Sequence, residues 1–289
     1  MKTGTIRKLF HDIVLKIKAI YPEHEALSIA NRLFEHYLDL TPSQRILSGH
    51  KFPDAEKTNH VNEAIQKLLR HEPLQYVLRK AYFMDMEFEV NPSVLIPRQE
   101  TEELAGMIIE EIKLRTLTQK VKILDIGTGS GCIAIALKHY VPHSEVFALD
   151  VSAPTLVTAR ANAAKYQAEI NFLELDILDS NCWKQLPEFD IIVSNPPYVT
   201  ESDKKWMQPN VLQYEPAIAL FVTDADPLVF YRTIAAFAKA NLVKNGSLWF
   251  EINEQFGSLT KKMLINEGFT ESNIFSDIHE KERFLHTTM

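Results

Sequence analysis

The sequence contains few of the features that mark secreted, membrane-spanning or nucleic-acid-binding proteins. Only two of its 289 residues are cysteines, Cys132 and Cys182, which is too few for a disulfide framework and favours a reducing compartment. No apolar run approaches the roughly 18 residues of a membrane span, and the N-terminal stretch lacks the apolar core of a signal peptide. The formal net charge of −7 argues against a surface built to hold a nucleic-acid backbone. We therefore expect a cytoplasmic, monomeric protein with no metal site, no membrane partner and no direct nucleic-acid partner.

Glycine and strand-like alternation are scarce in the first part of the chain. Residues 1–72 contain only Gly4 and Gly49. Apolar residues recur there at spacings of three and four, which is typical of helices that bury one face. Thr41 followed by Pro42 is a typical helix start, with a side-chain cap and proline at the first helical position. Residues 1–72 are therefore predicted to form a small helical bundle.

Strand-like and helix-like stretches alternate from residue 99 to residue 289, and segment 73–98 is predicted to be a connector with a short hairpin. Helical patterns separate five apolar strand candidates, and two late candidates lie too close together for a helical crossover. The candidates are 121–126, 145–151, 170–176, 190–195, 247–252, 272–278 and 283–289. This order predicts an α/β, Rossmann-like fold with a mostly parallel seven-stranded sheet and an antiparallel edge hairpin.

A glycine-rich loop follows the first of these strands. In the stretch ILDIGTGSGCIAIAL, Gly127, Gly129 and Gly131 have the spacing G-x-G-x-G, whereas nicotinamide dehydrogenases need G-x-G-x-x-G. This spacing favours a nucleoside with an amino-acid tail over a pyrophosphate. Asp150 ends the second strand, where a carboxylate can accept hydrogen bonds from both ribose hydroxyls. Asp176 ends the third strand, where polar groups could meet an adenine edge.

The fourth strand ends in Asn195-Pro196-Pro197-Tyr198, which offers acceptors but few donors. If the cofactor is S-adenosylmethionine, the substrate nucleophile must be aimed at its methyl group, and an amide or aromatic amine nitrogen is a weak nucleophile. The Asn195 side-chain oxygen and the Pro196 carbonyl can each accept one hydrogen from a substrate NH2 and stabilise charge that develops on its nitrogen. Pro197 stiffens the loop, and the ring of Tyr198 can pack against the flat substrate group. The loop is therefore predicted to hold an NH2 group for methylation.

Five segments together carry a resemblance to a known family. They are PLQYVL (73–78), VLIPRQETEEL (94–104), ILDIGTGSGCIAIAL (123–137), VSNPPYV (193–199) and YEPAIAL (214–220). In these segments the chain resembles the peptide chain release factor glutamine methyltransferases (PrmC/HemK family). The resemblance implies a class I S-adenosylmethionine-dependent methyltransferase fold. It also implies methylation of the side-chain amide nitrogen (N5) of the glutamine in the Gly-Gly-Gln motif of release factors, with the helical N-terminal region recognising the release factor.

The resemblance also implies roles for individual residues. The cofactor-binding residues would be Gly127, Thr128, Gly129, Ser130, Gly131, Asp150, Ile177 and Asn195. The substrate-binding residues would be Asn195, Pro196, Pro197 and Tyr198, and the catalytic ones among them Asn195, Pro196 and Tyr198. Segment 96–98 would close over the cofactor, with Arg98 in a structural role. The chain departs from the family pattern at Arg79, where glycine is usual, and at Gln99, where proline is usual.

Two other functions compete with this one. An adenine amino-group methyltransferase acting on DNA or RNA would also use Asn-Pro-Pro-Tyr on a planar amine. The net charge of −7 and the lack of a basic run disfavour it, because phosphate contacts need clustered lysine and arginine. A non-catalytic scaffold that kept the fold is the other alternative. It has no physical need for Gly127, Asp150 and Asn195 together.

Overall fold

The computed structural model describes residues 4–115 and 120–289, and the chain divides into two compact units. The first unit comprises the residues up to Lys80 with Gln208–Tyr214, and the second comprises Ala81–Met207 with Glu215–Met289. The boundary after Lys80 lies inside segment 73–98, so the proposed connector is divided between the units.

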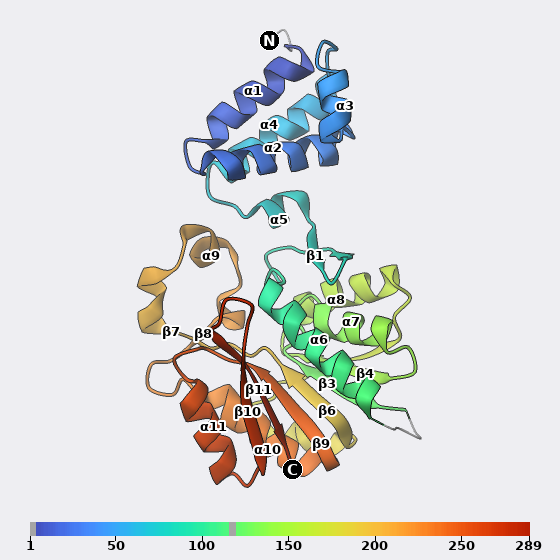
Figure 1. The fold of residues 1–289 in the computed structure, drawn as a ribbon, viewed down its shortest axis with the longest axis vertical. Coiled ribbons are helices and arrows are strands. Elements are labelled where there is room, and N and C mark those ends of the chain that lie inside the picture. The colour runs from blue at the N-terminus through green and yellow to red at the C-terminus, as the bar shows by residue number, and fades with distance from the viewer. Residues whose placement is uncertain (1–3, 116–119) are drawn as a thin grey trace. The chain divides into compact units, whose positions relative to one another are not determined.

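The first unit is a helical bundle (Figure 1). Its helices are α1 (Ile6–Ile17), α2 (Glu23–Leu38), α3 (Pro42–Leu47), α4 (Ala55–Leu68), α5 (Leu74–Leu78) and α9 (Pro209–Tyr214). The apolar faces of α1, α2 and α4 form one core, in which the rings of Phe10 and Phe34 meet edge to face at 5.2 Å. Thr41 caps α3 as expected, because its side chain accepts a hydrogen bond from the backbone N–H of Gln44. The predicted helical region is confirmed.

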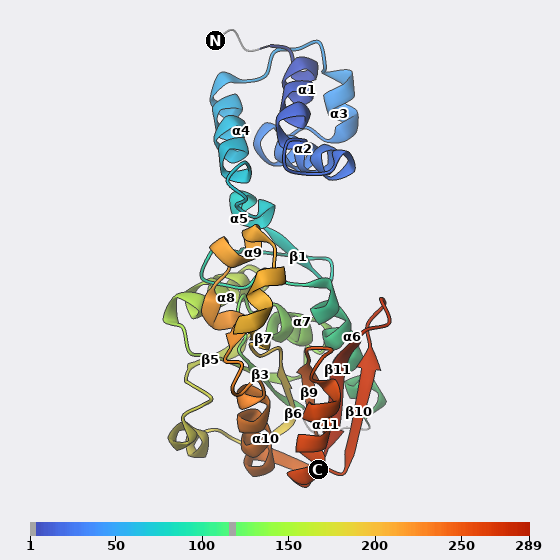
Figure 2. The same cartoon turned by 90° about the vertical axis from the view of Figure 1, so that its left-hand side faces the viewer.

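The second unit is built around a seven-stranded sheet with the order β10-β11-β9-β6-β3-β4-β5. The strands are β3 (Lys122–Ile126), β4 (Glu145–Asp150), β5 (Ile170–Glu174), β6 (Phe189–Ser194), β9 (Leu242–Glu251), β10 (Glu271–Ser276) and β11 (Glu282–Thr288). Neighbouring strands from β5 to β9 pair in parallel, whereas β11 is antiparallel to both β9 and β10. Figure 2 shows β5 and β10 at opposite sides of the sheet. The predicted sheet and its antiparallel hairpin are confirmed.

Helices cover both faces of this sheet, as expected for parallel strands that are apolar on both sides. They are α6 (Gln99–Leu114), α7 (Cys132–Tyr140), α8 (Ala153–Lys165), α10 (Val229–Asn241) and α11 (Gly257–Asn266). One core cluster joins α6 and α7 to side chains such as Ile123 and Val193, and the other joins α10 to Leu124 and Ile192. Successive strand residues thus alternate between two cores, which gives three layers.

Short elements complete the second unit. They are β1 (Ala81–Phe83), β2 (Met86–Phe88), β7 (Val199–Thr200), β8 (Phe221–Val222) and the 3₁₀ helices η1 (Ser180–Gln185), η2 (Glu201–Trp206) and η3 (Ala217–Ala219). β1 and β2 form the short antiparallel hairpin expected in this region. The carboxyl ends of β3, β4, β5 and β6 meet at one edge of the sheet, where ligands bind in folds of this class.

Candidate active site

The glycine loop after β3 bends through three residues with positive φ. The φ angles of Gly127, Gly129 and Gly131 are 75°, 56° and 81°, in the region that glycine adopts without strain. A Cβ at Gly127 or Gly129 would meet no atom within 4 Å, so the backbone there borders open space. A Cβ at Gly131 would instead crowd Ile135 and Ala159. The first two glycines therefore leave room for a ligand, and the third allows α7 and α8 to pack closely.

Asp125 and Thr128 hold this loop from beneath. Asp125 is completely buried, and its Oδ2 accepts a hydrogen bond from the Thr128 hydroxyl at 2.7 Å. Burial raises the pKa of the Asp125 carboxyl to about 7, and the hydrogen bond from Thr128 opposes this shift. These two side chains shape the loop and do not line the cavity beside it.

Asp150, at the end of β4, faces the loop. Its Oδ2 accepts a hydrogen bond from the Gly129 N–H at 3.1 Å, and its Oδ1 accepts one from the Ser152 N–H at 3.0 Å. Burial raises the pKa of the carboxyl, while these N–H groups lower it. Ser152, and not Asp150, is the N-cap of α8. Since each carboxylate oxygen can accept more than one hydrogen bond, Asp150 keeps acceptor capacity for a ligand.

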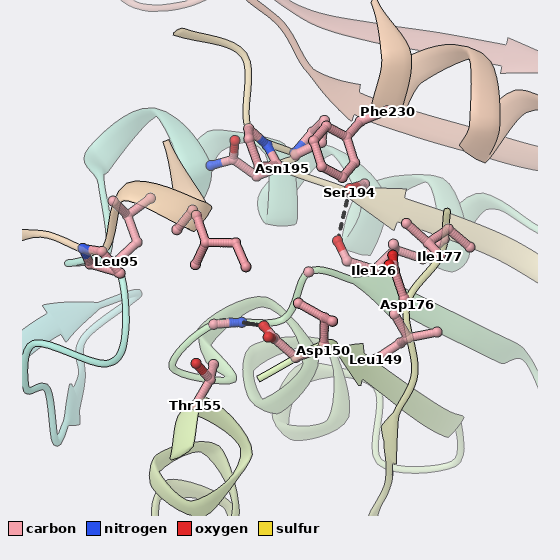
Figure 3. A pocket seen from close by; sticks show the side chains of 18 of the residues that line it. Leu95, Ile126, Leu149, Asp150, Thr155, Asp176, Ile177, Ser194, Asn195 and Phe230 are labelled. Atoms are coloured by element: carbon pink, nitrogen blue, oxygen red, sulfur yellow. Dashed lines mark hydrogen bonds between the residues drawn. The ribbon is translucent and has the colours of Figure 1, made fainter. Parts of the chain in front are cut away.

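A cavity of about 250 Å³ opens beside these residues (Figure 3). Asp150 and Asn195 lie on opposite sides of it, and Asp176 and Ile177 border a third side (Figure 3). Most of the wall is apolar, with side chains such as Leu149. Apolar walls with a few polar groups are typical of sites that bind small organic ligands.

Asn195 presents its side-chain nitrogen to the protein. Its Nδ2 donates to the Thr101 hydroxyl at 3.2 Å, and that hydroxyl donates to Glu251 Oε2 at 2.6 Å. Within residues 4–115 and 120–289, no residue donates a hydrogen bond to the Asn195 side-chain oxygen or to the Pro196 carbonyl. Both residues line the cavity. The loop thus offers two acceptors that no described residue engages.

Tyr198, three residues after Asn195, is half-buried and does not line the cavity. Its hydroxyl donates to Glu251 Oε1 at 3.0 Å, its carbonyl accepts from Asn253 Nδ2 at 3.3 Å, and its ring packs against the core that includes α10. Glu251 is 1% exposed. Burial raises the pKa of its carboxyl, while the hydrogen bonds from Thr101 and Tyr198 and the charge of Arg283 lower it.

The residues predicted for the site therefore fall into two groups. Those that line the cavity are Gly127, Gly129, Asp150, Ile177, Asn195, Pro196 and Pro197. Those that do not line it are the buried Thr128, Ser130 and Gly131 and the half-buried Tyr198.

Arg98 pairs with a residue that the sequence interpretation did not single out. Its guanidinium donates to Glu215 Oε1 at 2.6 Å, and Glu215 Oε2 accepts from the Ile96 N–H at 3.2 Å. The Glu215 side chain is 1% exposed. The pair joins the segments that carry Leu95 and Pro216, both of which line the cavity, in keeping with a structural role for Arg98.

Thr101 and Glu251 are further residues that the sequence interpretation missed. Glu251 stands out as a lone charge at the end of the apolar run SLWFEI, and that signal was available. Its position beside Asn195 depends on the register that pairs Ser194 with Phe250. Thr101 belongs to a segment already noted for its resemblance, but its contact depends on how α6 packs on the sheet.

The described residues contain neither a cluster of metal ligands nor a helix that could span a membrane. No group of three or more histidine, cysteine, aspartate or glutamate side chains is arranged to hold a metal ion within residues 4–115 and 120–289. In the same part of the chain, no helix has both the length and the apolar character needed to cross a membrane.

Comparisons with known proteins agree with this arrangement. Residues 104–213 match the family model of the methyltransferase small domain, and residues 9–78 match that of the PrmC N-terminal domain. The release factor glutamine methyltransferase of Flavobacterium psychrophilum is 42% identical over 273 residues, which cover 94% of this chain and 95% of the relative. The release factor glutamine methyltransferase of Bacteroides thetaiotaomicron is 38% identical, with coverages of 93% and 95%.

A solved structure shares the fold. The methyltransferase from Pyrococcus furiosus aligns with a TM-score of 0.50 and 17% identity, over 81% of this chain and 98% of that one. At this identity the likeness concerns the fold alone. The curated relatives, in contrast, match along nearly the whole chain, including the Asn-Pro-Pro-Tyr region and the helical first unit. The chain belongs to the release factor glutamine methyltransferase family.

Proposed function

We propose that the protein transfers a methyl group from S-adenosylmethionine to the side-chain amide nitrogen of the glutamine in the Gly-Gly-Gln motif of release factors. One observation carries this proposal. Asn195 and Pro196 follow β6 and line the cavity, and neither the Asn195 side-chain oxygen nor the Pro196 carbonyl accepts a hydrogen bond from the described residues. Two such acceptors suit a planar NH2 group, which has two hydrogens to donate.

The residues around the cavity fit S-adenosylmethionine. Gly127 and Gly129 leave open space where the backbone borders the cavity. Asp150 would hold the ribose with its remaining acceptor capacity, and Leu149 and Ile177 offer apolar surface for the adenine. When bound, S-adenosylmethionine supplies an electrophilic methyl group on a sulfonium centre.

The work of the chain's own residues is orientation and charge stabilisation. A substrate amide that enters the cavity loses water and needs an acceptor for each N–H. Asn195 and Pro196 supply one acceptor each, which fixes the nitrogen's direction and stabilises positive charge that develops on it during transfer. No residue has to remove a proton beforehand, because the methylated nitrogen becomes acidic and loses its proton afterwards.

The helical first unit would recognise the release factor. This role is supported by the match of residues 9–78 to the PrmC N-terminal domain. Ile46, Leu47 and Phe52 are 66%, 77% and 71% exposed around the end of α3, which is unusual for large apolar side chains gathered in one short segment. Substituting serine at Ile46 and Leu47 should raise KM for the release factor and leave the Kd for S-adenosylmethionine unchanged.

Mass spectrometry of the release factor tests the proposed reaction. Purified protein is incubated with S-adenosylmethionine and release factor, and the Gly-Gly-Gln peptide is examined for one added methyl group on glutamine. Asn195→Ala serves as the control with strongly lowered activity. Bulk DNA and RNA are offered in parallel with tritiated cofactor, and label in nucleic acid alone would establish the adenine methyltransferase alternative.

A monomeric, cytoplasmic enzyme is part of the same proposal. Cys132 and Cys182 are free cysteines, and a chain with so few cysteines needs no oxidising compartment to fold. Light scattering of the purified protein tests the monomeric state, and a measured mass of twice the 33.1 kDa chain would contradict it.

A further inference from the structure

A buried carboxylate lies directly behind the acceptor loop. Glu251 ends β9, and the register that pairs Ser194 with Phe250 places it beside Asn195. Its two oxygens accept hydrogen bonds from two hydroxyls, Thr101 at 2.6 Å and Tyr198 at 3.0 Å. With 1% exposure, this carboxylate has little access to water. Such a group is costly to bury, so its presence calls for a reason other than packing.

The hydrogen-bond directions in this network follow from counting protons. A carboxylate only accepts, so the single proton of the Thr101 hydroxyl is directed to Glu251. Toward Asn195 the same hydroxyl can then act only as an acceptor. Asn195 must therefore turn its NH2 group to Thr101, as the 3.2 Å contact from Nδ2 describes. The amide oxygen, on the opposite branch of the planar group, accepts no hydrogen bond from the described residues.

We propose that Glu251 is a positioning residue, which acts through Thr101 to hold the Asn195 amide with its oxygen toward the substrate. This inference rests on the proposed role of Asn195 as an acceptor for the substrate NH2. Without Glu251, the Thr101 hydroxyl could donate to the Asn195 oxygen instead. The amide would then reverse and present its own NH2 to the substrate NH2, two donors facing each other.

The principal test is Glu251→Gln, which keeps the side-chain volume and replaces one oxygen by an NH2 group. Among the described residues, only Glu251 accepts a hydrogen bond from the Tyr198 hydroxyl, so the remaining side-chain oxygen of the variant has to accept that bond. The new NH2 group then donates to the Thr101 hydroxyl oxygen, and the Thr101 proton turns to the Asn195 side-chain oxygen. The Asn195 amide is thereby reversed. We expect kcat to fall about 10–100-fold while the Kd for S-adenosylmethionine changes less than about twofold.

A matched control exists at the other end of the same helix–strand contact. Glu111 on α6 accepts hydrogen bonds from Trp249 and Ser247 on β9 and lies away from the cavity lining. Glu111→Gln makes the same chemical change between the same two elements, and we expect it to leave kcat unchanged. If Glu251→Gln lowers kcat and Glu111→Gln does not, the loss comes from the orientation of Asn195 and not from a general need for a carboxylate between α6 and β9.

A double-mutant cycle shows whether Glu251 acts through Asn195. In an Asn195→Ala background there is no amide left to orient, so Glu251→Gln should lower kcat by less than about twofold further. Equal losses in both backgrounds would overturn the positioning role. Thr101→Val and Thr101→Ser provide a second pair that does not depend on the folding of the Glu251 variant. We expect the first to lose activity like Glu251→Gln and the second, which keeps the hydroxyl, to retain it.

Neutron diffraction of the deuterated wild-type protein shows the orientation of the Asn195 amide directly. This measurement does not depend on enzymatic activity. The expected map has the Thr101 deuteron directed at Glu251 and the two Asn195 amide deuterons on the Thr101 side. A Thr101 deuteron directed at Asn195, or a Glu251→Gln enzyme with wild-type kcat, would overturn the inference. If the wild-type protein leaves release factors unmethylated, the proposed function fails, and the neutron map still decides how the amide is held.

Discussion

The two sides of the cavity are built in different ways. On the proposed cofactor side, the fixed groups are held mainly by backbone atoms and by near neighbours in sequence, as in the contacts from Thr128 to Asp125 and from Gly129 to Asp150. On the substrate side, Asn195 is held by side chains that are far away in the chain. Thr101 is 94 residues from Asn195, and Glu251 is 150 residues from Thr101.

This difference predicts different sensitivities. A loop held by its own backbone tolerates loss of one side chain with its shape intact, so damage appears as weaker ligand binding. A side chain held by a relay of hydroxyl and carboxylate groups depends on each member, because a buried polar group without its partner costs free energy or changes orientation. Substitutions on the two sides should therefore separate binding from turnover.

The largest effect is expected on the substrate side. Asn195→Ala removes one of the two acceptors for the substrate NH2 and should lower kcat by about 10²–10³-fold, the range for loss of one preorganised stabilising group. The Kd for S-adenosylmethionine, measured by calorimetry, should change little, because the groups on the cofactor side are unaltered. A variant that loses cofactor affinity but keeps its turnover would reverse the assignment of the two sides.

The pH dependence of the free energy of unfolding tests the state of Asp125, which lies on the proposed cofactor side. Its pKa of about 7 lies above that of an aspartate in the unfolded chain, so between these values the folded state binds more protons. The free energy of unfolding therefore falls as pH rises from 5 to 8, by about 2–3 kcal/mol from this group. Asp125→Asn should flatten that fall in denaturant titrations. The exposed Glu169→Gln should leave it unchanged, and equal pH profiles for Asp125→Asn and the wild type would exclude the raised pKa.

The affinity for S-adenosylmethionine tests the role of Asp150 on the same side of the cavity. Asp150→Ala should weaken S-adenosylmethionine binding by about 1.5–3 kcal/mol, the scale of hydrogen bonds to a charged group. Because the substrate side is intact, kcat at saturating cofactor should remain close to that of the wild type. Unchanged affinity in calorimetry would show that the ribose is held elsewhere, and a collapse of kcat at saturation would show that the two sides are coupled.

The same contrast explains what the sequence could disclose. The glycine spacing, Asp150 and the Asn-Pro-Pro-Tyr loop are local patterns at strand ends, and the alternation of elements brings those ends to one edge. The sheet with its antiparallel hairpin and the helical first unit were predicted for the same reason. The Thr101–Glu251 relay and the Arg98–Glu215 pair each join segments more than 100 residues apart. They depend on register and helix packing, which no local pattern encodes.

Tyr198 belongs to the local Asn-Pro-Pro-Tyr pattern but also makes a long-range contact that this pattern does not predict. The sequence predicts that its ring packs against the substrate; in the structure the half-buried ring packs against the core that includes α10 and does not line the cavity. Its hydroxyl belongs to the substrate-side relay through Glu251. Three hydrogen bonds separate the hydroxyl from the Asn195 amide, while Thr101 contacts that amide directly.

The smallest effect is therefore expected for Tyr198→Phe. The ring remains, Thr101 still donates to Glu251, and Asn195 keeps its orientation, so kcat should fall only about 2–5-fold. The lost hydrogen bond to a buried carboxylate should lower the free energy of unfolding by about 1–3 kcal/mol, measured with denaturant. A fall in kcat as large as that of Asn195→Ala would give the hydroxyl a direct part in the reaction. The Tyr198 hydroxyl would then have to contact the substrate itself and would not act only through Glu251 and Thr101.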